Sequence, residues 1–357
     1  MAQSAFFVRS APCNRKRRRA ETLRLLLFLL DLYALAVALG SLDVVCICCL
    51  VSAYEDEVVA VALNVIRIGV RSVLNSFVGR YGKINNINEY NNFVFDLYGT
   101  LIEMHTDEEE LPFWAKMAEL YSVYGADYTA AGLRKEYKRL CKEEERKLIA
   151  ETGCRIPEIK LEKVFARLLT EAKHSHKTAH DFSRNIDETA YYISNSFRVL
   201  SRHRMKLYPA VPELLQYLRD SGKGVFMLSN AQAVFTTPEI EQLDLAKYFD
   251  DIFLSSDIGV KKPEAAFFEK LLQKHSLDPV KTVMVGNDFY ADMGIAVACG
   301  TAGAHINSDK LSARERAKQK KMLEAEYGRS AEKIFEYRSI RDLYNALSMK
   351  YIVMYQF

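Results

Sequence analysis

A short apolar run that ends on a carboxylate constrains the fold of this chain more than any other feature. Residues 93–95 are Phe-Val-Phe, Asp96 follows, and a Gly-Thr pair stands at positions 99 and 100. An apolar run bounded by turn residues is typical of a buried strand. Because open α/β sheets bind ligands just beyond the carboxyl ends of their strands, the pattern makes Asp96 a candidate nucleophile or metal ligand. A carboxylate that only caps the next turn is the alternative interpretation.

Three later stretches carry further polar groups in similar settings. Residues 224–230 are Gly-Val-Phe-Met-Leu-Ser-Asn, so a second apolar run ends on a hydroxyl and an amide. Residues 259–263 are Gly-Val-Lys-Lys-Pro, and residues 282–288 are Thr-Val-Met-Val-Gly-Asn-Asp, with Asp292 shortly after. In this order the four stretches resemble the signature motifs of the haloacid dehalogenase-like (HAD) hydrolase superfamily. The resemblance covers roughly residues 91–307.

Strand-like and helical segments alternate from residue 206 onward, which predicts a parallel sheet with helices on both faces. The final strand of this sheet is expected at residues 304–307, and one helical run is expected to begin near Pro238. Residues 105–205 show helical periodicity without clear strand pairs, and the resemblance implies that they form a helical cap. The expected organisation is an α/β, doubly wound, Rossmann-like HAD core with an inserted helical cap: core at residues 89–104 and 206–357, cap at 105–205.

Composition limits the possible partners and compartments. A chain of 357 residues can hold two domains, or one large domain with an insertion. Its net charge of +3 is small, so no nucleic-acid partner is expected. The seven cysteines show no zinc-site spacing, and their odd number argues against a secreted disulfide framework. A cytoplasmic, reducing location is therefore expected, and the sequence leaves the oligomeric state open.

Residues 1–88 differ in character from the rest of the chain. A basic cluster precedes a strongly apolar stretch at residues 25–51, a pattern that favours a membrane anchor. Asp31 and Asp43 interrupt that stretch, and each would cost about 2.5–3.5 kcal/mol near the bilayer centre. We expect an N-terminal extension of uncertain role, either packed as an accessory helical segment or dispensable for the enzyme. A membrane anchor through residues 25–74 is the alternative.

The resemblance implies a role for each polar residue that follows a strand. Asp96 matches the nucleophile, which forms a covalent intermediate. Ser229 matches the hydroxyl that hydrogen-bonds to the transferring group. Lys262 matches the ammonium that neutralises nucleophile and substrate, because it directly precedes the proline, whereas Lys261 is the competing candidate. The expected substrate-binding residues are Tyr98, Thr100 and Asn230.

Two acidic residues of the fourth motif indicate a metal. Asp288 and Asp292 offer the hard oxygen ligands that Mg²⁺ prefers, and their spacing would place both on one face of a helical turn. The resemblance implies that Mg²⁺ is bound by Asp96, the backbone carbonyl of Tyr98, Asp288 and Asp292. The alternative is a helix N-cap at Asp288 and a surface charge at Asp292.

Tyr98 separates the candidate functions. The phosphatase branch has an aspartate there as general acid and base, and a tyrosine with a pKa of about 10 is a poor substitute. The 2-haloacid dehalogenases, which use no metal, share the Asp-Leu-Tyr-Gly-Thr form of residues 96–100, but they also carry a tyrosine where Phe268 stands. A metal-free site would gain only repulsion from the acidic pair. The sequence therefore predicts a Mg²⁺-dependent phosphatase for a small anionic ester, with a metal-free dehalogenase or a non-catalytic binding protein as alternatives.

Overall fold

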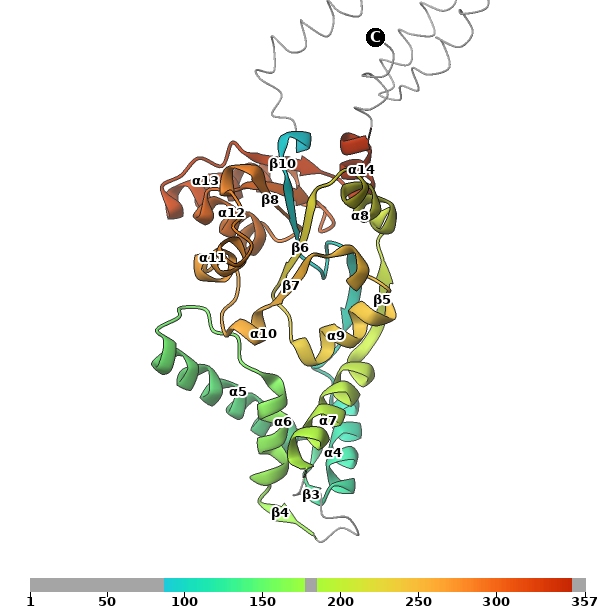
Figure 1. Ribbon diagram of the computed structural model, residues 1–357. Coiled ribbons are helices and arrows are strands. Elements are labelled where there is room, and N and C mark those ends of the chain that lie inside the picture. The colour runs from blue at the N-terminus through green and yellow to red at the C-terminus, as the bar shows by residue number, and fades with distance from the viewer. Residues whose placement is uncertain (1–86, 177–184, 349–357) are drawn as a thin grey trace, which may run out of the picture. The chain divides into compact units, whose positions relative to one another are not determined.

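The computed structural model describes residues 87–176 and 185–348 (Figure 1). The chain divides into two compact units, Met1–Ile84 and Asn85–Phe357, and the described residues belong to the second. The expected N-terminal extension, with its possible anchor at residues 25–74, lies outside the described residues except for its last two positions. In the two described ranges, no helix is both long enough and apolar enough to cross a membrane.

A six-stranded parallel sheet forms the centre of the described chain (Figure 1). Its order is β10-β9-β8-β1-β6-β7, and each neighbouring pair runs in parallel. The strands are β1 (Asn92–Phe95), β6 (Gly224–Ser229), β7 (Asp251–Leu254), β8 (Thr282–Gly286), β9 (Ala302–Ile306) and β10 (Ile334–Tyr337). The predicted α/β fold with a doubly wound parallel sheet is confirmed.

The first motif strand, β1, lies in the middle of the sheet. Asn92 pairs with Gly224 of β6 on one side and with Thr282 of β8 on the other, in parallel register. All three strands therefore end at the same edge of the sheet. Because the strand order turns back at β1, this edge is a topological switch point, where open α/β sheets form ligand sites.

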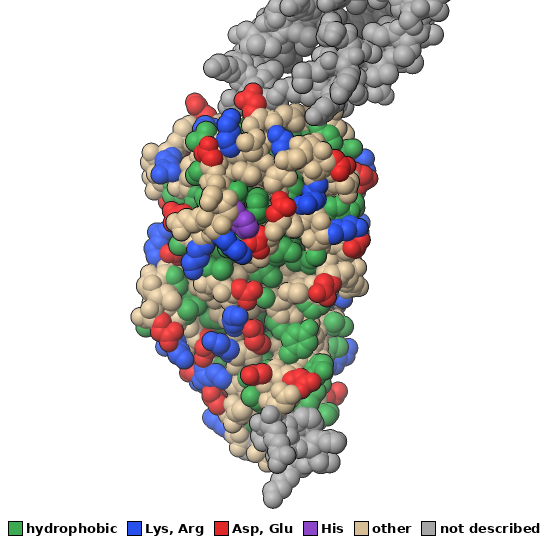
Figure 2. Space-filling view, viewed as in Figure 1, with side chains coloured by type: hydrophobic (Ala, Val, Ile, Leu, Met, Phe, Trp, Pro, Cys, Tyr) green, Lys and Arg blue, Asp and Glu red, His purple; other side chains and the backbone are tan. Residues whose placement is uncertain are grey.

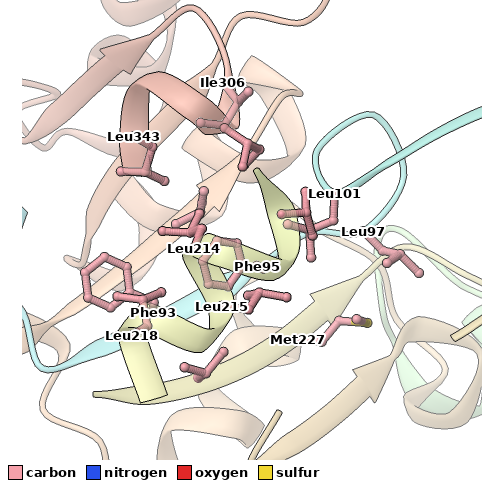
Figure 3. Close-up of a cluster of buried hydrophobic side chains, with 14 of the residues drawn as sticks. Phe93, Phe95, Leu97, Leu101, Leu214, Leu215, Leu218, Met227, Ile306 and Leu343 are labelled. Atoms are coloured by element: carbon pink, nitrogen blue, oxygen red, sulfur yellow. The ribbon is translucent and has the colours of Figure 1, made fainter. Parts of the chain in front are cut away.

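The side chains of β1 alternate between two buried faces of the sheet. Phe93 and Phe95 join an apolar cluster with α8 (Val211–Asp220) and α14 (Ile340–Ser348) on one face (Figure 3). A strand covered on both faces has no polar side, which explains why the sequence run is continuously apolar. Each phenylalanine buried in this way contributes roughly 1.5–3 kcal/mol.

The opposite face is covered by a second pair of helices. Val94 packs there with α11 (Ala265–Lys274) and α12 (Gly294–Cys299), which supply Phe267, Phe268 and Ile295 to the cluster. Helices thus cover both faces of the sheet, and β1 is held rigidly between them. Other helices of the core are α9 (Ala233–Gln242), α10 (Ser255–Ile258), the π-helical turn η5 (Phe289–Met293) and α13 (Ala313–Tyr327).

A block of helices lies between β1 and β6 in the sequence, and we call residues 111–201 the helical insertion. Its helices are α4 (Leu111–Val123), α5 (Ala130–Thr152), α6 (Leu161–Thr170) and α7 (Ile186–Ser201). They enclose an apolar cluster of their own, with Phe197 of α7 in ring contact with Trp114 and Phe165. Phe235 of α9 stacks on Phe197 with ring centroids 6.2 Å apart, so this cluster extends into the core.

The expectation that residues 105–205 contain no strand pair is wrong at both ends of that range. Strand β2 (Ile102–Thr106) pairs antiparallel with β5 (Arg202–Leu207), and two short strands, β3 (Ala126–Asp127) and β4 (His174–Ser175), also pair. The β2–β5 ribbon has a charged side, on which Glu103 forms ion pairs with two basic side chains of β5. Its weak apolar alternation gave no strand signal. The predicted boundaries at 104/105 and 205/206 fall inside these strands.

Two further expectations about the core are corrected. The strand around residues 304–307 is β9, but it is not the last, because β10 follows it and forms the edge of the sheet. Helix α9 begins at Ala233 and contains Pro238 in its interior, whereas the helical run was expected to begin near that proline. A proline usually marks the first turn of a helix, and tertiary packing overrides that preference here.

Acidic and basic side chains are interspersed over the core and the helical insertion on the face shown in Figure 2. Large hydrophobic side chains are also exposed on α7, namely Tyr191, Tyr192, Val199 and Leu200.

The expectation that the protein binds no nucleic acid stays a prediction.

Candidate active site

Asp96 follows β1 directly and is held by donors from three separate segments. Its backbone N–H donates to the carbonyl of Val285, 2.9 Å away, which fixes the residue beside β8. The Oδ1 atom accepts from Lys262 Nζ at 2.7 Å and from Ser229 Oγ at 3.0 Å. The Oδ2 atom accepts from Thr100 Oγ1 at 3.3 Å. The structure therefore brings three of the predicted site residues, Thr100, Ser229 and Lys262, against the predicted nucleophile.

Lys262 lies between two carboxylates. Its side chain is 1% exposed, and Nζ donates to Asp96 Oδ1, to Asp292 Oδ1 at 2.6 Å and to the carbonyl of Leu228 at 2.8 Å. All three donors of the ammonium are thus used. Burial opposes the charge, but Asp292 and Asp96 together raise the pKa of Lys262, so it remains a cation. Its neighbour Lys261 is partly exposed and has no such contact with Asp96.

The Asn230 amide supports the lysine rather than pointing to open space. Its Oδ1 accepts from the backbone N–H of Lys262 at 2.8 Å, and its Nδ2 donates to the backbone carbonyl of the same residue at 3.1 Å. This two-point contact fixes the segment that delivers the ammonium to Asp96. Substrate binding by Asn230 stays a prediction. The observed contacts show that Asn230 positions the backbone of Lys262.

The two acidic residues of the fourth motif occupy different environments. Asp292 is 1% exposed, and its Oδ2 accepts from the backbone N–H of Asp288 at 2.9 Å. Burial raises the pKa of Asp292 more than Lys262 lowers it. The interpretation of Asp292 as a surface charge is therefore wrong. Asp288 is exposed and caps η5, since its Oδ1 accepts from the N–H groups of Tyr290 and Ala291.

Glycine at two positions makes this packing possible. A Cβ atom on Gly286 would lie 2.1 Å from Asp292 Oδ2, so only a glycine lets this carboxylate lie against the end of β8. Gly99 has φ of +80°, and a Cβ there would lie 2.6 Å from the Asn287 side chain. Asn287 in turn accepts from Thr100 Oγ1 at 3.1 Å. This contact ties the end of β8 to residues 97–102, which we call the nucleophile loop.

The donors expected for Mg²⁺ fit the ion in kind, because they are carboxylate and carbonyl oxygens. Both Asp292 oxygens are engaged by N–H donors, whereas both hydrogen bonds of Asp288 fall on one oxygen. Within the described ranges, no three His, Cys, Asp or Glu side chains are grouped closely enough to hold a metal ion. Binding of Mg²⁺ by Asp96, the Tyr98 carbonyl, Asp288 and Asp292 stays a prediction.

Tyr98 is locked in place by residues that sequence reasoning missed. Its hydroxyl donates to Glu239 Oε2 at 2.5 Å and lies 3.0 Å from Thr236 Oγ1, both on α9. The Arg198 guanidinium lies 5.2 Å from the centre of its ring. Burial, and then the charge of Glu239, raise the pKa of Tyr98 above its ordinary value. The hydroxyl is thus a still weaker acid than a free tyrosine, and a role in substrate binding stays a prediction.

One signal for Glu239 was present in the sequence. It stands four residues after Phe235 and four before Leu243, so apolar side chains flank it on one face of any helix that contains them. A glutamate on an apolar face needs a cation, and no local lysine or arginine supplies one. The partners, Arg198 and Arg202, come from about forty residues earlier, which no local pattern reveals.

A second buried group braces the fourth motif. The Nε2 atom of His305, in β9, lies 3.0 Å from the carbonyl oxygen of Asn287. The centroids of the His305 and Phe289 rings are 4.6 Å apart. Burial lowers the pKa of His305, which keeps the ring neutral. The ring therefore fixes the backbone just before Asp288 without adding charge to the site.

A family model described as haloacid dehalogenase-like hydrolase matches residues 90–300, which is more than half of the chain. The chain belongs to the haloacid dehalogenase-like hydrolases. The match begins just before β1, ends after α12 and includes all four sequence motifs. The protein is therefore a hydrolase, as the sequence predicted.

Curated relatives of this hydrolase carry phosphatase names. A glyceraldehyde 3-phosphate phosphatase of Methanothermobacter thermautotrophicus is 27% identical over 30% of this chain and 48% of its own length. A phosphoglycolate phosphatase of Vibrio vulnificus is 26% identical over 38% of this chain and 61% of its own length. The chain thus spans about half to three fifths of the length of these relatives.

Solved structures of dehalogenases and phosphatases are also similar. A 2-haloacid dehalogenase from Pseudomonas syringae pv. tomato is 20% identical, with 73% of this chain and 99% of that chain covered and a TM-score of 0.47. A HAD phosphatase from Thermococcus onnurineus is 18% identical, with 72% and 98% covered and a TM-score of 0.38.

Proposed function

We propose that this HAD hydrolase is a Mg²⁺-dependent phosphatase that acts on a small phosphate ester. The charge of the site carries the proposal. Asp96 and Asp288 bring two carboxylates, and Asp292 a third whose pKa is raised by burial, against the single positive charge of Lys262. An anionic ester would be repelled by such a site unless a divalent cation joined it. The phosphatase names of the curated relatives support the same class.

The residues of the chain divide the reaction into two displacements. A carboxylate oxygen of Asp96 forms a bond to phosphorus while the bond from phosphorus to the ester oxygen breaks, and the alkoxide leaves with the electron pair and takes a proton from water. Water then attacks the acyl phosphate and releases inorganic phosphate and the free carboxylate. Lys262 and Ser229 orient Asp96 through their contacts to Oδ1. Mg²⁺, held by Asp96, the Tyr98 carbonyl and Asp288, would neutralise charge on the phosphoryl oxygens.

The same proposal assigns the helical insertion as a cap that covers the substrate. The insertion contacts the core near two motifs: Phe197 stacks on Phe235 of α9, and Pro157 pairs with Val260 just before Lys262. A cap in this position would exclude water and select the substrate.

Phosphate and halide assays test the proposed function. We expect the protein to release phosphate from an aryl phosphate with Mg²⁺ and to lose that activity in a chelator. Halide release from 2-chloropropionate without metal would instead support the dehalogenase alternative, which the form of residues 96–100 favours. If neither phosphate nor halide were released, the phosphatase proposal would be contradicted.

Asp288→Ala should weaken Mg²⁺ binding by at least about 10-fold, because it removes one of the two carboxylate ligands in direct contact with the ion. Isothermal calorimetry on the wild type and the variant measures this directly. Asp278→Ala is the matched control, since Asp278 also caps a short helical turn, by accepting from the N–H of Val280, yet precedes β8. Equal affinity in all three proteins would exclude Asp288 as a ligand.

The wild-type enzyme should depend strongly on its leaving group. Tyr98 cannot protonate a departing alkoxide, because its hydroxyl already donates a hydrogen bond to Glu239 and the pKa of Tyr98 is raised. General acid catalysis is worth about 10²- to 10⁴-fold, so alkyl phosphates should react slower than nitrophenyl phosphate by a factor in that range. Turnover numbers across a series of leaving groups measure the dependence. Equal rates for alkyl and aryl esters would show that another group supplies the proton.

A further inference from the structure

Glu239 is a buried carboxylate on which three segments of the chain converge. Its side chain is 3% exposed. Oε1 accepts from Arg198 Nε at 2.8 Å and from Arg202 Nη1 at 3.2 Å, while Oε2 accepts from the Tyr98 hydroxyl at 2.5 Å. Arg198 belongs to α7 of the helical insertion, Arg202 begins β5, and Tyr98 lies two residues after Asp96.

The negative charge of Glu239 and the positive charges of Arg198 and Arg202 compensate one another. The two arginines are 12% and 19% exposed, so neither is well solvated. Glu239 compensates both, and the Arg198 guanidinium also lies over the Tyr98 and Phe235 rings at 5.2 and 5.6 Å. Removal of the carboxylate charge would leave two partly buried cations without a counterion next to the nucleophile loop.

We propose that Glu239 is a positioning residue that couples the helical insertion to the nucleophile loop. One carboxylate oxygen accepts a hydrogen bond from Tyr98, and the other accepts most of the hydrogen bonds from Arg198 and Arg202. The loop that follows Asp96 is therefore fixed by the same side chain that fixes the end of α7. The proposal deepens the proposed phosphatase function and rests on it for the role of Asp96, but the coupling itself concerns structure and can be measured without activity.

Other contacts between insertion and core do not depend on Glu239. The Pro157–Val260 bridge, with a hydrogen bond from Glu158 N–H to the Gly259 carbonyl at 3.1 Å, anchors a different part of the insertion. The Phe197–Phe235 stack is apolar. Loss of the Glu239 charge should therefore loosen the nucleophile loop and the end of α7 without detaching the insertion.

Hydrogen exchange gives the activity-independent readout. The N–H groups of Gly99, Leu101 and Ile102 form backbone hydrogen bonds within the loop, at 2.8, 2.8 and 3.0 Å. In Glu239→Gln, these amides should exchange at least about 10-fold faster than in wild type. The amides of Val283, Met284 and Val285 in β8 should be unchanged, which distinguishes local loosening from global destabilisation.

Kinetics with nitrophenyl phosphate gives the second readout. Glu239→Gln should lower kcat by about 10- to 100-fold, because a displaced nucleophile loses alignment, while KM changes less than about threefold. Tyr98→Phe, which removes only the hydroxyl, should cause a smaller loss. The double variant should be no worse than Glu239→Gln, since both changes break one connection. Glu241→Gln, an exposed glutamate on the same helix, is the control and should match wild type.

The outcomes separate the two proposals. Unchanged exchange at Gly99, Leu101 and Ile102 in Glu239→Gln would overturn the coupling, whatever the activity. Additive kcat losses in the double variant would also overturn it. If the wild type released no phosphate, the phosphatase proposal would fail while the exchange data still decided the coupling. If Glu239→Gln did not fold, faster exchange in Tyr98→Phe would sustain the proposal and unchanged exchange there would overturn it.

Discussion

Asp96→Asn should reduce turnover by about 10⁴-fold or more and leave the fold in place. The amide has the shape of the carboxylate but cannot form the covalent intermediate that the proposed reaction requires. Its oxygen can still accept from Lys262 and Ser229, as Oδ1 does in the wild type. Phosphate release measures the loss, and urea unfolding shows whether stability is retained.

Ser229→Ala is the companion variant for this test. It removes one donor to Asp96 Oδ1 and leaves the nucleophile present. We therefore expect a far smaller loss of turnover, about 10-fold, from a single orienting hydrogen bond. A wild-type rate in Asp96→Asn, or equal losses in the two variants, would remove Asp96 from the role of nucleophile.

Lys262→Met should destabilise the protein by about 3–5 kcal/mol, the usual cost of removing one partner from a buried ion pair. The methionine keeps most of the volume of the lysine, so a cavity contributes little. The loss arises because Asp96 and Asp292 stay buried, at 10% and 1% side-chain exposure, without their shared counterion. Activity should fall as well, since Lys262 orients the nucleophile.

The destabilisation by Lys262→Met should depend on pH in a known direction. Burial already raises the pKa of Asp292, and removal of the ammonium raises it further. A carboxyl whose pKa is higher in the folded state stabilises the fold below its unfolded pKa of about 3.9, and that stabilisation is lost as the pH rises through the folded value. The variant should therefore be more strongly destabilised at pH 8 than at pH 5.

Lys261→Met serves as the control for this measurement. Lys261 is partly exposed, so its replacement should change the free energy of unfolding by less than about 0.5 kcal/mol at either pH. Urea unfolding of the three proteins at pH 5 and pH 8 gives the comparison. A pH-independent loss in Lys262→Met would mean that the two carboxylates do not depend on the lysine for their charge.

The arrangement around Asp96 was predictable because strand periodicity and strand ends are local signals. Continuous apolar runs marked β1, β6 and β8, and parallel strands bring the residues after them to one edge. The choice of Lys262 over Lys261 rested on the adjoining proline. The structure places Lys262, not Lys261, against Asp96.

Other features had no local signal. The ribbon β2–β5 is short and charged on one side, and β10 is an edge strand with little apolar pattern. The amide of Asn230 could have faced a ligand, and a tertiary contact instead pairs it with the backbone of Lys262. The link from Tyr98 to Glu239 and Arg198 joins residues about 140 and 100 positions from the nucleophile loop, so only the folded chain reveals it.

The position of β1 at the centre of the sheet has a consequence for synthesis of the protein. Asp96 meets Ser229 and Lys262 across 133 and 166 positions of the chain, so a ribosome must complete most of the polypeptide before the site can assemble. The helical insertion, whose contacts are more local, can fold earlier. Until β6 and β8 have been synthesised, both edges of the apolar strand β1 lack a pairing strand. We therefore expect residues 92–95 to be a chaperone-binding segment of the nascent chain.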